Sequence, residues 1–311
     1  MKINKKSKIF IAGHNGMVGS ALVRKFKKKG FQNILTISKK KLNLIDQDKV
    51  FKFLKKNKPD MVIIAAAKVG GIIANMKNKS KFIYENLQIQ NNLIHGSYLA
   101  GIKKLIFLGS SCIYPTKANQ PLKEKYLLTS PLEKTNDSYA IAKIAGIMMC
   151  NNYRDNFRLD YKCLMPPNLY GPGDSYDAEN SHFFSALINK IYNAKKTNKN
   201  FITLWGTGKA YRELMYVDDV ANAVFFFMNK KIKEKFINIG SGTDNTIFWY
   251  AKFVMKQLGL NLKIKFDRRK PDGMSRKLLD STLAHKYGWK CKTSLESGFK
   301  KTFDDFLLNQ R

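Results

Sequence analysis

The chain has 311 residues, 44% of them hydrophobic, and its 56 lysine and arginine residues against 23 acidic ones give a formal net charge of +33 at pH 7. This length and composition predict a large buried core and exclude a disordered chain. The lysines are spread along the whole sequence without a basic tail or an aromatic-interleaved basic motif. We therefore expect no specific nucleic-acid partner, although a basic surface attracts anionic substrates.

A glycine-rich turn follows the first predicted strand, residues 9–12. Gly13, Gly16 and Gly19 lead into a helix whose apolar residues recur at a helical period. Glycine is needed where the backbone turns tightly, approaches a pyrophosphate or packs a helix against a strand, and the helix N-terminus supplies amide dipoles for the anion. The spacing G-x-x-G-x-x-G is typical of short-chain dehydrogenases and predicts a dinucleotide site.

The second predicted strand, residues 34–37, ends in Ser38, Lys39, Lys40 and Lys41. An NAD enzyme usually places a carboxylate at this point for the ribose 2′-hydroxyl. This chain offers cations instead, which pair with a 2′-phosphate. The sequence therefore predicts NADP(H) rather than NAD as the cofactor.

Strands and helices alternate through the first half of the chain. Residues 61–67, 104–110 and 161–171 have the pattern of buried parallel strands, and residues 81–100 and 138–157 have the pattern of helices. This alternation predicts a doubly wound, Rossmann-type α/β fold. Ligands bind such a sheet beyond the carboxyl ends of its strands, where we expect Gly13, Ala66, Ser110 and Asn168.

Three polar side chains are placed to act on one carbonyl group. Ser110 follows an apolar strand, and Tyr139 and Lys143 lie one turn apart on one face of a predicted helix. Tyr139 is expected to give a proton to the alkoxide that forms from a ketone, Ser110 to hydrogen-bond the same oxygen, and Lys143 to lower the phenol pKa from about 10. These three residues predict hydride transfer to a ketone.

Beyond Gly171 the alternation of strands and helices breaks down. We expect an NADP-binding domain at residues 1–172, with a return segment at about 214–240 that contains a helix over 215–228, and a smaller, discontinuous substrate domain at 173–311. The short apolar stretch near the basic N-terminus is the first strand and not a signal peptide, and no apolar run approaches the roughly 20 residues that span a bilayer. Four cysteines form no C-x-x-C pair and no metal-like cluster, which favours a cytoplasmic location and argues against a metal site.

Several blocks together resemble one known family. In chain order these blocks are IAGHNGMVGSAL, AAAKVGGI, FLGSSCIYP, SYAIAKIAGI, NLYGP, NSH, WGTG, YRE, VDD, KPDG and RKLLD. This order resembles that of the GDP-L-fucose synthase family of extended short-chain dehydrogenases, and the resemblance runs almost end to end. It implies the substrate GDP-4-keto-6-deoxy-D-mannose, the cofactor NADP(H), epimerisation at C3 and C5, and reduction at C4 to give GDP-L-fucose. It also implies that Ser110, Tyr139 and Lys143 carry the reduction, whereas Cys112 and His182 carry the epimerisations.

The resemblance extends to the binding residues. For the cofactor it implies Gly13, Asn15, Gly16, Met17, Val18, Gly19, Lys39, Lys40, Ala65, Ala66, Ala67, Tyr139, Lys143, Pro166, Asn168, Leu169 and His182. For the substrate it implies Ser111, Asn168, Lys190, Trp205, Arg212 and Asp272. The family often has an arginine where this chain has Asn15, which leaves Lys39 and Lys40 as the expected partners of the 2′-phosphate. Pro167 replaces a common threonine, and we expect that change to be silent.

The epimerisations require an acid and a base in addition to the three groups that carry the reduction. A 4-ketone acidifies the protons at C3 and C5, so an acid and a base on opposite faces of the sugar can invert both centres through enolates. Cys112, two residues beyond Ser110, is expected to return to the same side of a strand and to face the same sugar. A thiol with a pKa of about 8.5 beside a histidine suits this task. The alternatives are a small buried hydrophobic role for Cys112 and a backbone hydrogen bond for His182.

Other readings of the sequence stay open. Arg212 suits a diphosphate, with a surface ion pair to Glu213 or Asp218 as the alternative. A nucleotide-sugar 4-epimerase or 4-ketoreductase would use the same Ser, Tyr and Lys residues. A 4,6-dehydratase would need an acidic pair after Ser110, where this chain has Ser111 and Cys112. A non-catalytic binding protein should have lost at least one of the catalytic groups, and all five are present in this chain. The helices at residues 81–100 and 139–157 correspond to those that form a homodimer interface in this class.

Overall fold

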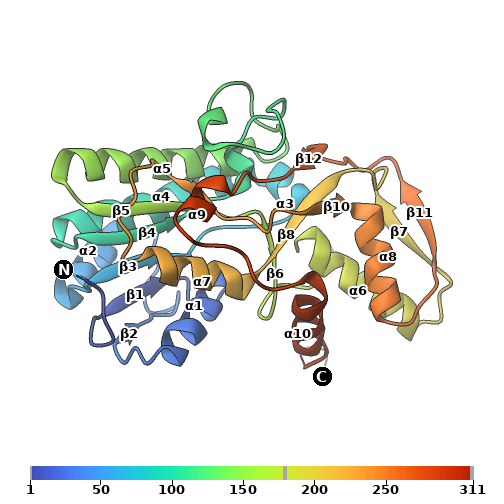
Figure 1. Cartoon of the computed structure of the whole chain (residues 1–311), viewed down its shortest axis with the longest axis horizontal. Coiled ribbons are helices and arrows are strands. Elements are labelled where there is room, and N and C mark those ends of the chain that lie inside the picture. Colours follow the sequence, from blue (N-terminus) through green and yellow to red (C-terminus); the bar gives the residue numbers. More distant parts are fainter. Residues whose placement is uncertain (1, 178–180, 309–311) are drawn as a thin grey trace.

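The computed structural model of the protein describes residues 2–177 and 181–308. Within these ranges the larger sheet has six parallel strands in the order β2–β1–β3–β4–β5–β9, and helices cover both of its faces (Figure 1). The strands are β1 (Ile9–Ala12), β2 (Ile34–Leu35), β3 (Met61–Ile64), β4 (Lys104–Leu108), β5 (Asp160–Met165) and β9 (Ile237–Asn238). The predicted doubly wound, Rossmann-type α/β fold is confirmed.

The strand order reverses beside β1. The chain runs from β1 out to β2 and then returns to place β3 on the other side of β1. Strand β3 continues in register with β1, so that the amide of Ala65 still donates to the carbonyl of Ala12 at 3.0 Å. Ligands of doubly wound sheets bind at such a reversal, beyond the carboxyl ends of the strands. The glycine turn and residues 65–67 therefore begin at the expected binding edge.

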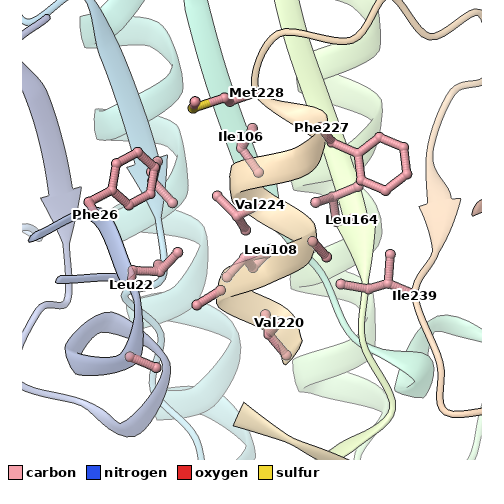
Figure 2. Close-up of a cluster of buried hydrophobic side chains, with 14 of the residues drawn as sticks. Leu22, Phe26, Ile106, Leu108, Leu164, Val220, Val224, Phe227, Met228 and Ile239 are labelled. Atoms are coloured by element: carbon pink, nitrogen blue, oxygen red, sulfur yellow. The ribbon is translucent and has the colours of Figure 1, made fainter. Parts of the chain in front are cut away.

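One face of the sheet is covered by α1 (Met17–Lys28) and α7 (Val217–Phe227). Side chains alternate along a strand, and Ile9 and Ile11 of β1 belong to the apolar cluster on this side. Figure 2 shows α7 lying over the face of the sheet, with Val220 and Val224 in the same apolar cluster as Ile106 and Leu108 of β4 and Leu164 of β5. The helix expected over residues 215–228 is thus present and packs on the first sheet.

The opposite face carries α2 (Gln47–Asn57), α4 (Lys79–Leu99) and α5 (Asp137–Phe157). A Cβ atom at Gly146 would lie 2.5 Å from the ring of Phe107, so the glycine lets α5 pack directly on β4. Tyr139 and Lys143 precede Gly146 by seven and three residues, on the same face of the helix. The close packing of α5 therefore carries both side chains to the end of β4, where Ser110 lies.

A second layer is built around β8 (Tyr211–Tyr216), shown on the right of Figure 1. Strand β8 pairs with β6 (Asn168–Tyr170), β10 (Asp244–Thr246) and β12 (Arg276–Lys277), and a separate parallel pair joins β7 (Phe201–Trp205) to β11 (Lys263–Asp267). The helices that accompany these strands are α3 (Ile72–Lys77), α6 (Phe183–Lys196), α8 (Ile247–Gln257) and α10 (Leu295–Leu308). The short helix α9 (Thr282–Lys286) packs instead on the first sheet, and two short 3-10 turns are η1 (Ser111–Ile113) and η2 (Glu124–Tyr126). A third apolar cluster lies mainly between α6, α8 and α10.

Four predicted strands differ from the observed ones, and two of them, expected at 61–67 and 104–110, differ only in that they end earlier, at Ile64 and Leu108. The run expected as one strand over 161–171 is two strands, because Pro166 and Pro167 lack the amide hydrogens that a sheet ladder requires. Its second half, β6, leaves the main sheet and pairs with β8. The strand expected at 34–37 ends at Leu35. The break at the two prolines is what turns the chain from the first sheet into the second layer.

The return of β9 and α7 to the first sheet supports the division into domains expected from the sequence. We retain as a proposal that residues 1–172, together with about 214–240, bind the dinucleotide and that the rest of 173–311 binds the substrate. None of the helices in the described part of the chain is long and apolar enough to cross a bilayer.

Candidate active site

A cavity of about 740 Å³ opens at the carboxyl ends of β1, β3 and β4 and continues to the second layer around β8. Its volume is in the upper part of the range for small-molecule sites. Among the residues predicted to form the site, all line this cavity except Gly19 and Lys40. The cavity thus brings together residues that lie as far apart in the chain as Gly13 and Asp272.

The glycine turn fits a pyrophosphate. Gly13 has φ +88°, and a Cβ atom there would lie 2.7 Å from the backbone of Ala66, so the turn requires glycine. Helix α1 follows with Gly16 at its N-cap, without a side-chain cap and without an acidic residue in its first turn. The first amides of α1 are therefore left for an anion. Gly19 has a different role, because it packs against the carbonyl of Gly13 and does not line the cavity.

The end of β2 distinguishes the two lysines expected to hold a 2′-phosphate. Lys39 lines the cavity, whereas Lys40 does not, and both side chains are exposed. The cavity wall between residues 37 and 45 contains no carboxylate. This wall suits NADP(H), and the structure corrects the pairing of Lys39 with Lys40, since only Lys39 faces the site.

The two lysines provide a matched pair of variants. Lys39→Ala should weaken NADPH binding by about tenfold while NADH binding changes little, because only NADPH carries the phosphate that a charge-assisted bond holds. Lys40→Ala removes the same charge one residue away and should leave both affinities within about twofold. Titration of each variant with both cofactors by fluorescence measures the effect. Equal losses for NADPH and NADH in Lys39→Ala would show that Lys39 contributes only to the general positive field.

Ser110, Tyr139 and Lys143 meet at the end of β4, as predicted. The Ser110 hydroxyl oxygen accepts a hydrogen bond from the amide of Cys112 at 3.3 Å and is also hydrogen-bonded to Tyr139. The Lys143 ammonium lies 5.7 Å from the centre of the Tyr139 ring and donates to the carbonyl of Leu108 at 2.8 Å. Three groups that can donate a proton or a hydrogen bond therefore converge at one point of the cavity.

The pKa of Tyr139 moves in the opposite direction to the one expected from Lys143. Burial raises it above its ordinary value, and Cys112 adds to this rise, whereas the hydrogen bond with Ser110 acts against it. Burial also lowers the pKa of Lys143 to about 8. The net shift of the phenol pKa is thus upward and not downward as expected, because desolvation is its largest cause. Tyr139 remains protonated at neutral pH, as a proton donor must be.

The buried amine of Lys143, only 3% exposed, should cost the protein stability. The folded pKa of about 8 lies below the ordinary 10.5, so the folded protein binds fewer protons between these values, and its stability should rise with pH across that window. Lys143→Met should therefore be more stable than the parent at pH 7, by roughly 1–2 kcal/mol once the lost bond to Leu108 is counted.

Urea unfolding at pH 7 and above pH 10 tests this prediction. The advantage of Lys143→Met should shrink at the higher pH, where the folded amine is neutral and the pH approaches the ordinary pKa of 10.5 that the amine has in the unfolded chain. The same change at the exposed Lys40 should alter stability by less than about 0.5 kcal/mol. A Lys143→Met variant that is less stable than the parent at pH 7 would contradict the prediction.

Cys112 reaches the cavity through a turn and not along a strand. The ladder of β4 ends at Leu108, and residues 111–113 form the 3-10 turn η1, which the Ser110 side chain caps. The expectation that Cys112 lies on a strand is therefore wrong, although its side chain still lines the same cavity as Ser110. The reason is local: a serine hydroxyl that bonds the amide two residues on competes with continued strand pairing.

Two donors that were not predicted contact the sulfur of Cys112. The side-chain amide of Asn136 donates to Sγ at 3.3 Å, and the ammonium of Lys277 donates to it at 3.6 Å. Asn136 is the N-cap of α5, and Lys277 stands in the RKLLD block, which signalled the family without assigning a role to the lysine. No local pattern links either residue to Cys112.

His182 lies at the N-cap of α6 and lines the cavity. The carboxylate of Asp174 is close enough for the charge of His182 to lower its pKa, although burial has the larger effect and raises it. Asp174 is in turn hydrogen-bonded to the hydroxyl of Ser185, one turn into α6. An acidic group thus stands beside the histidine, on the part of the cavity wall that β6 and α6 share.

The far end of the cavity contains the predicted substrate residues. Arg212 is only 8% exposed, and it donates to the carbonyls of Tyr211, Asp272 and Met274. The alternative of a surface ion pair is therefore wrong: Glu213 follows on the opposite side of β8, and Asp218 pairs with Arg24. Of the five N–H groups of the guanidinium, two remain for an anion.

Trp205 and Asp272 border the same end. The Lys190 ammonium lies 5.9 Å from the centre of the Trp205 ring and donates to the carbonyl of Thr203. The carboxylate of Asp272 accepts from both the amide and the hydroxyl of Thr207, and it thereby fixes the loop after β7. Ser111 is buried, and its amide donates to the carbonyl of Pro166.

The whole chain is similar to several known proteins. The model of the NAD dependent epimerase/dehydratase family matches residues 9–240. The chain is 47% identical to GDP-L-fucose synthase 1 of Arabidopsis thaliana, over 98% of this chain and 95% of that protein, and 43% identical to the GDP-L-fucose synthase of Escherichia coli (strain K12), over 98% of each. The solved structure of a GDP-mannoheptose C4 reductase from Campylobacter jejuni with NADP bound is 36% identical, has a TM-score of 0.89, and matches 98% of this chain and 99% of that chain.

Proposed function

Because the chain belongs to the NAD dependent epimerase/dehydratase family, we propose that it acts as a GDP-L-fucose synthase. Such an enzyme inverts C3 and C5 of GDP-4-keto-6-deoxy-D-mannose and reduces C4 with NADPH to give GDP-L-fucose. One observation carries the proposal beyond the family level. A single cavity holds both the Ser110, Tyr139 and Lys143 set for reduction and the Cys112 and His182 set for epimerisation.

The epimerisations need a base, an acid and a partner for the ketone oxygen. Cys112 removes a proton from the carbon next to the 4-ketone, and His182 returns a proton to the opposite face. Ser110 and Tyr139 hydrogen-bond the oxygen on which the enolate charge develops. General acid and base groups of this kind typically contribute about 10² to 10⁴ in rate each.

The reduction uses the other set. Bound NADPH supplies a hydride to C4, and the glycine turn, the first amides of α1 and Lys39 are the groups that hold this cofactor. Tyr139 gives its phenolic proton to the alkoxide oxygen, and Ser110 keeps that oxygen within reach of the phenol. Lys143, which is protonated below a pH of about 8, supplies the positive charge beside the tyrosine as it loses its proton.

A C4 reductase that does not epimerise is the second candidate. The 36% identity to the Campylobacter jejuni GDP-mannoheptose C4 reductase favours it, because that protein is named only for reduction. A plain reductase needs Ser110, Tyr139 and Lys143 but has no use for Cys112 and His182 in its cavity. We therefore place the epimerase-reductase first.

Product analysis separates the two candidates. Purified protein is incubated with GDP-4-keto-6-deoxy-D-mannose and NADPH, and the product is identified by NMR. We expect GDP-L-fucose, with C3 and C5 both inverted. A 6-deoxy sugar reduced at C4 but unchanged at C3 and C5 would support the reductase and would overturn the first proposal.

We also propose that the protein is a homodimer that joins through α4 and α5. These two helices pack against each other and leave apolar side chains exposed, namely Tyr84 and Leu99 on α4 and Ile141, Met148 and Phe157 on α5. Light scattering should give twice the 35.7 kDa of one chain, and Ile141→Lys with Met148→Lys should reduce it to the mass of one chain. A parent mass of 35.7 kDa across working concentrations would contradict the dimer.

The cytoplasmic location stays a proposal, supported by four cysteines that form no disulfide among the residues described.

A further inference from the structure

The buried ammonium of Lys277 has an unusual set of neighbours. The residue lies on β12 and is only 8% exposed. In the part of the chain that the structure describes, its amine makes no ion pair with a carboxylate, and its one hydrogen-bond partner is the sulfur of Cys112. Burial of a charge without a counter-charge is costly. A negatively charged partner would therefore stabilise the Lys277 ammonium, and the Cys112 sulfur is the group that it contacts.

The surroundings of Cys112 point the same way. Its sulfur receives two donors, Lys277 and Asn136, and the guanidinium of Arg212 is close enough to interact electrostatically. Among the described residues the sulfur accepts two hydrogen bonds and donates none, an arrangement that suits a thiolate better than a thiol. The other titratable group beside it is the phenol of Tyr139. Glu133 lies in the same cavity wall but bonds Thr135.

Another cysteine of the chain shows the opposite arrangement. Cys291 donates to the carboxylate of Asp219 at 3.3 Å. Burial, with Asp219 as the next cause, raises the pKa of Cys291 to about 12. Cys291 is thus held as a thiol by a carboxylate, whereas Cys112 faces an ammonium and an amide. The two residues form an internal comparison.

We propose that Lys277 is the counter-ion of Cys112, a positioning residue that keeps this cysteine as a thiolate in the free enzyme. The use of that thiolate rests on the proposed function. The thiolate takes a proton from C3 or C5: the C–H bond breaks, an S–H bond forms, and the electron pair passes to the ketone oxygen as an enolate. Lys277 keeps its own proton throughout. His182 then donates a proton to the opposite face, and the thiol and the imidazole exchange with water to restore the starting state.

Alkylation of the free enzyme tests the pairing without any sugar. Iodoacetamide reacts with the thiolate, and mass spectrometry follows Cys112 and Cys291 separately over a range of pH. In Lys277→Met the alkylation of Cys112 at pH 7 should slow by about tenfold or more and should recover at higher pH. The rate at Cys291 should not change. Lys277→Arg, which keeps the charge, should restore most of the rate at Cys112.

Lys190→Met is the matched control for charge. It removes one partly buried ammonium from the same cavity, but that ammonium bonds Thr203 and not Cys112. Alkylation of Cys112 in Lys190→Met should stay within about twofold of the parent. Parent-rate alkylation of Cys112 in Lys277→Met would overturn the proposal. An equal slowing in both variants would also overturn it, because the effect would then belong to the total charge of the cavity.

A kinetic measurement separates this proposal from a role in substrate binding. Lys277→Met should lower the maximal rate of proton exchange at C3 and C5 and shift its pH profile upward, while reduction of an already epimerised sugar is retained. A raised KM with unchanged maximal rate and unchanged alkylation would assign Lys277 to substrate binding and overturn the pairing. If the proposed substrate itself is wrong, the exchange assay fails for the parent also, and the alkylation result remains valid.

Discussion

Replacement of Cys112 by serine should nearly abolish exchange of the C3 and C5 protons of GDP-4-keto-6-deoxy-D-mannose with solvent. In deuterated water without NADPH, the parent should incorporate deuterium at both carbons, because enolate formation needs an acid and a base but no hydride. Cys112→Ser should reduce this exchange by about two orders of magnitude or more, some 3 kcal/mol of barrier, since a serine hydroxyl keeps its proton at neutral pH and is a far weaker base than a thiolate. NMR follows the loss of the two proton signals.

The serine variant should keep its fold. Its hydroxyl can accept the same hydrogen bonds from Asn136 and Lys277, and the turn that holds residue 112 depends on the Ser110 cap. NADPH binding and the reduction of an already epimerised keto sugar should therefore remain. His182→Asn should lower exchange less than Cys112→Ser does and should leave a product inverted at one centre at most, because Cys112 can still remove a proton and return it to its own face. If both variants exchange at the parent rate, the acid and base are other groups, and the plain reductase becomes the better account.

The first half of the fold was predictable because its signals are local. Apolar runs ending in glycine marked β1 and its turn, and the observed strand has the expected bounds, Ile9–Ala12. The helix after it and the helix that bears Tyr139 also follow from periodicity. The apolar pattern over residues 161–171 predicts one strand, but this run contains Pro166 and Pro167. Two prolines remove two ladder donors, and that local fact outweighs the hydrophobic pattern.

The site was predictable to the extent that its members are close in sequence. Ser110 and Cys112 share one turn, and Tyr139 and Lys143 share one helical face, so spacing alone placed them together. Lys277 lies 165 residues beyond Cys112 and reaches it only because β12 pairs with β8, so no local pattern could reveal the contact. The distinction between Lys39 and Lys40 depends on the direction in which each side chain leaves a loop, and sequence does not specify that direction. The pKa of Tyr139 depends on burial that only the folded cavity creates.

Tyr139→Phe should stop the reduction and leave in place Cys112 and His182, the base and the acid of the epimerisations, together with Ser110 as a partner for the ketone oxygen. The phenylalanine ring can keep the contact with the Lys143 ammonium, which lies 5.7 Å from the ring centre, so the wall of the cavity is preserved while the proton donor is lost. Turnover of NADPH with the keto sugar should fall by about 10²- to 10⁴-fold, which is the usual cost of removing a general acid. Absorbance of NADPH measures this loss, and fluorescence titration should show that NADPH still binds.

A second tyrosine on the same helix supplies the control for this variant. The hydroxyl of Tyr153 hydrogen-bonds Nδ1 of His95 at 2.6 Å, away from the cavity, so Tyr153→Phe should lower stability by about 1 kcal/mol without changing turnover. Deuterium exchange at C3 and C5 should persist in Tyr139→Phe, because Cys112 and His182 remain and Ser110 still hydrogen-bonds the ketone oxygen. A Tyr139→Phe variant that turns over within about twofold of the parent would remove this residue from the reduction. A variant that loses exchange and reduction together would make Tyr139 necessary for the enolate as well, so that the two sets of residues would not act independently.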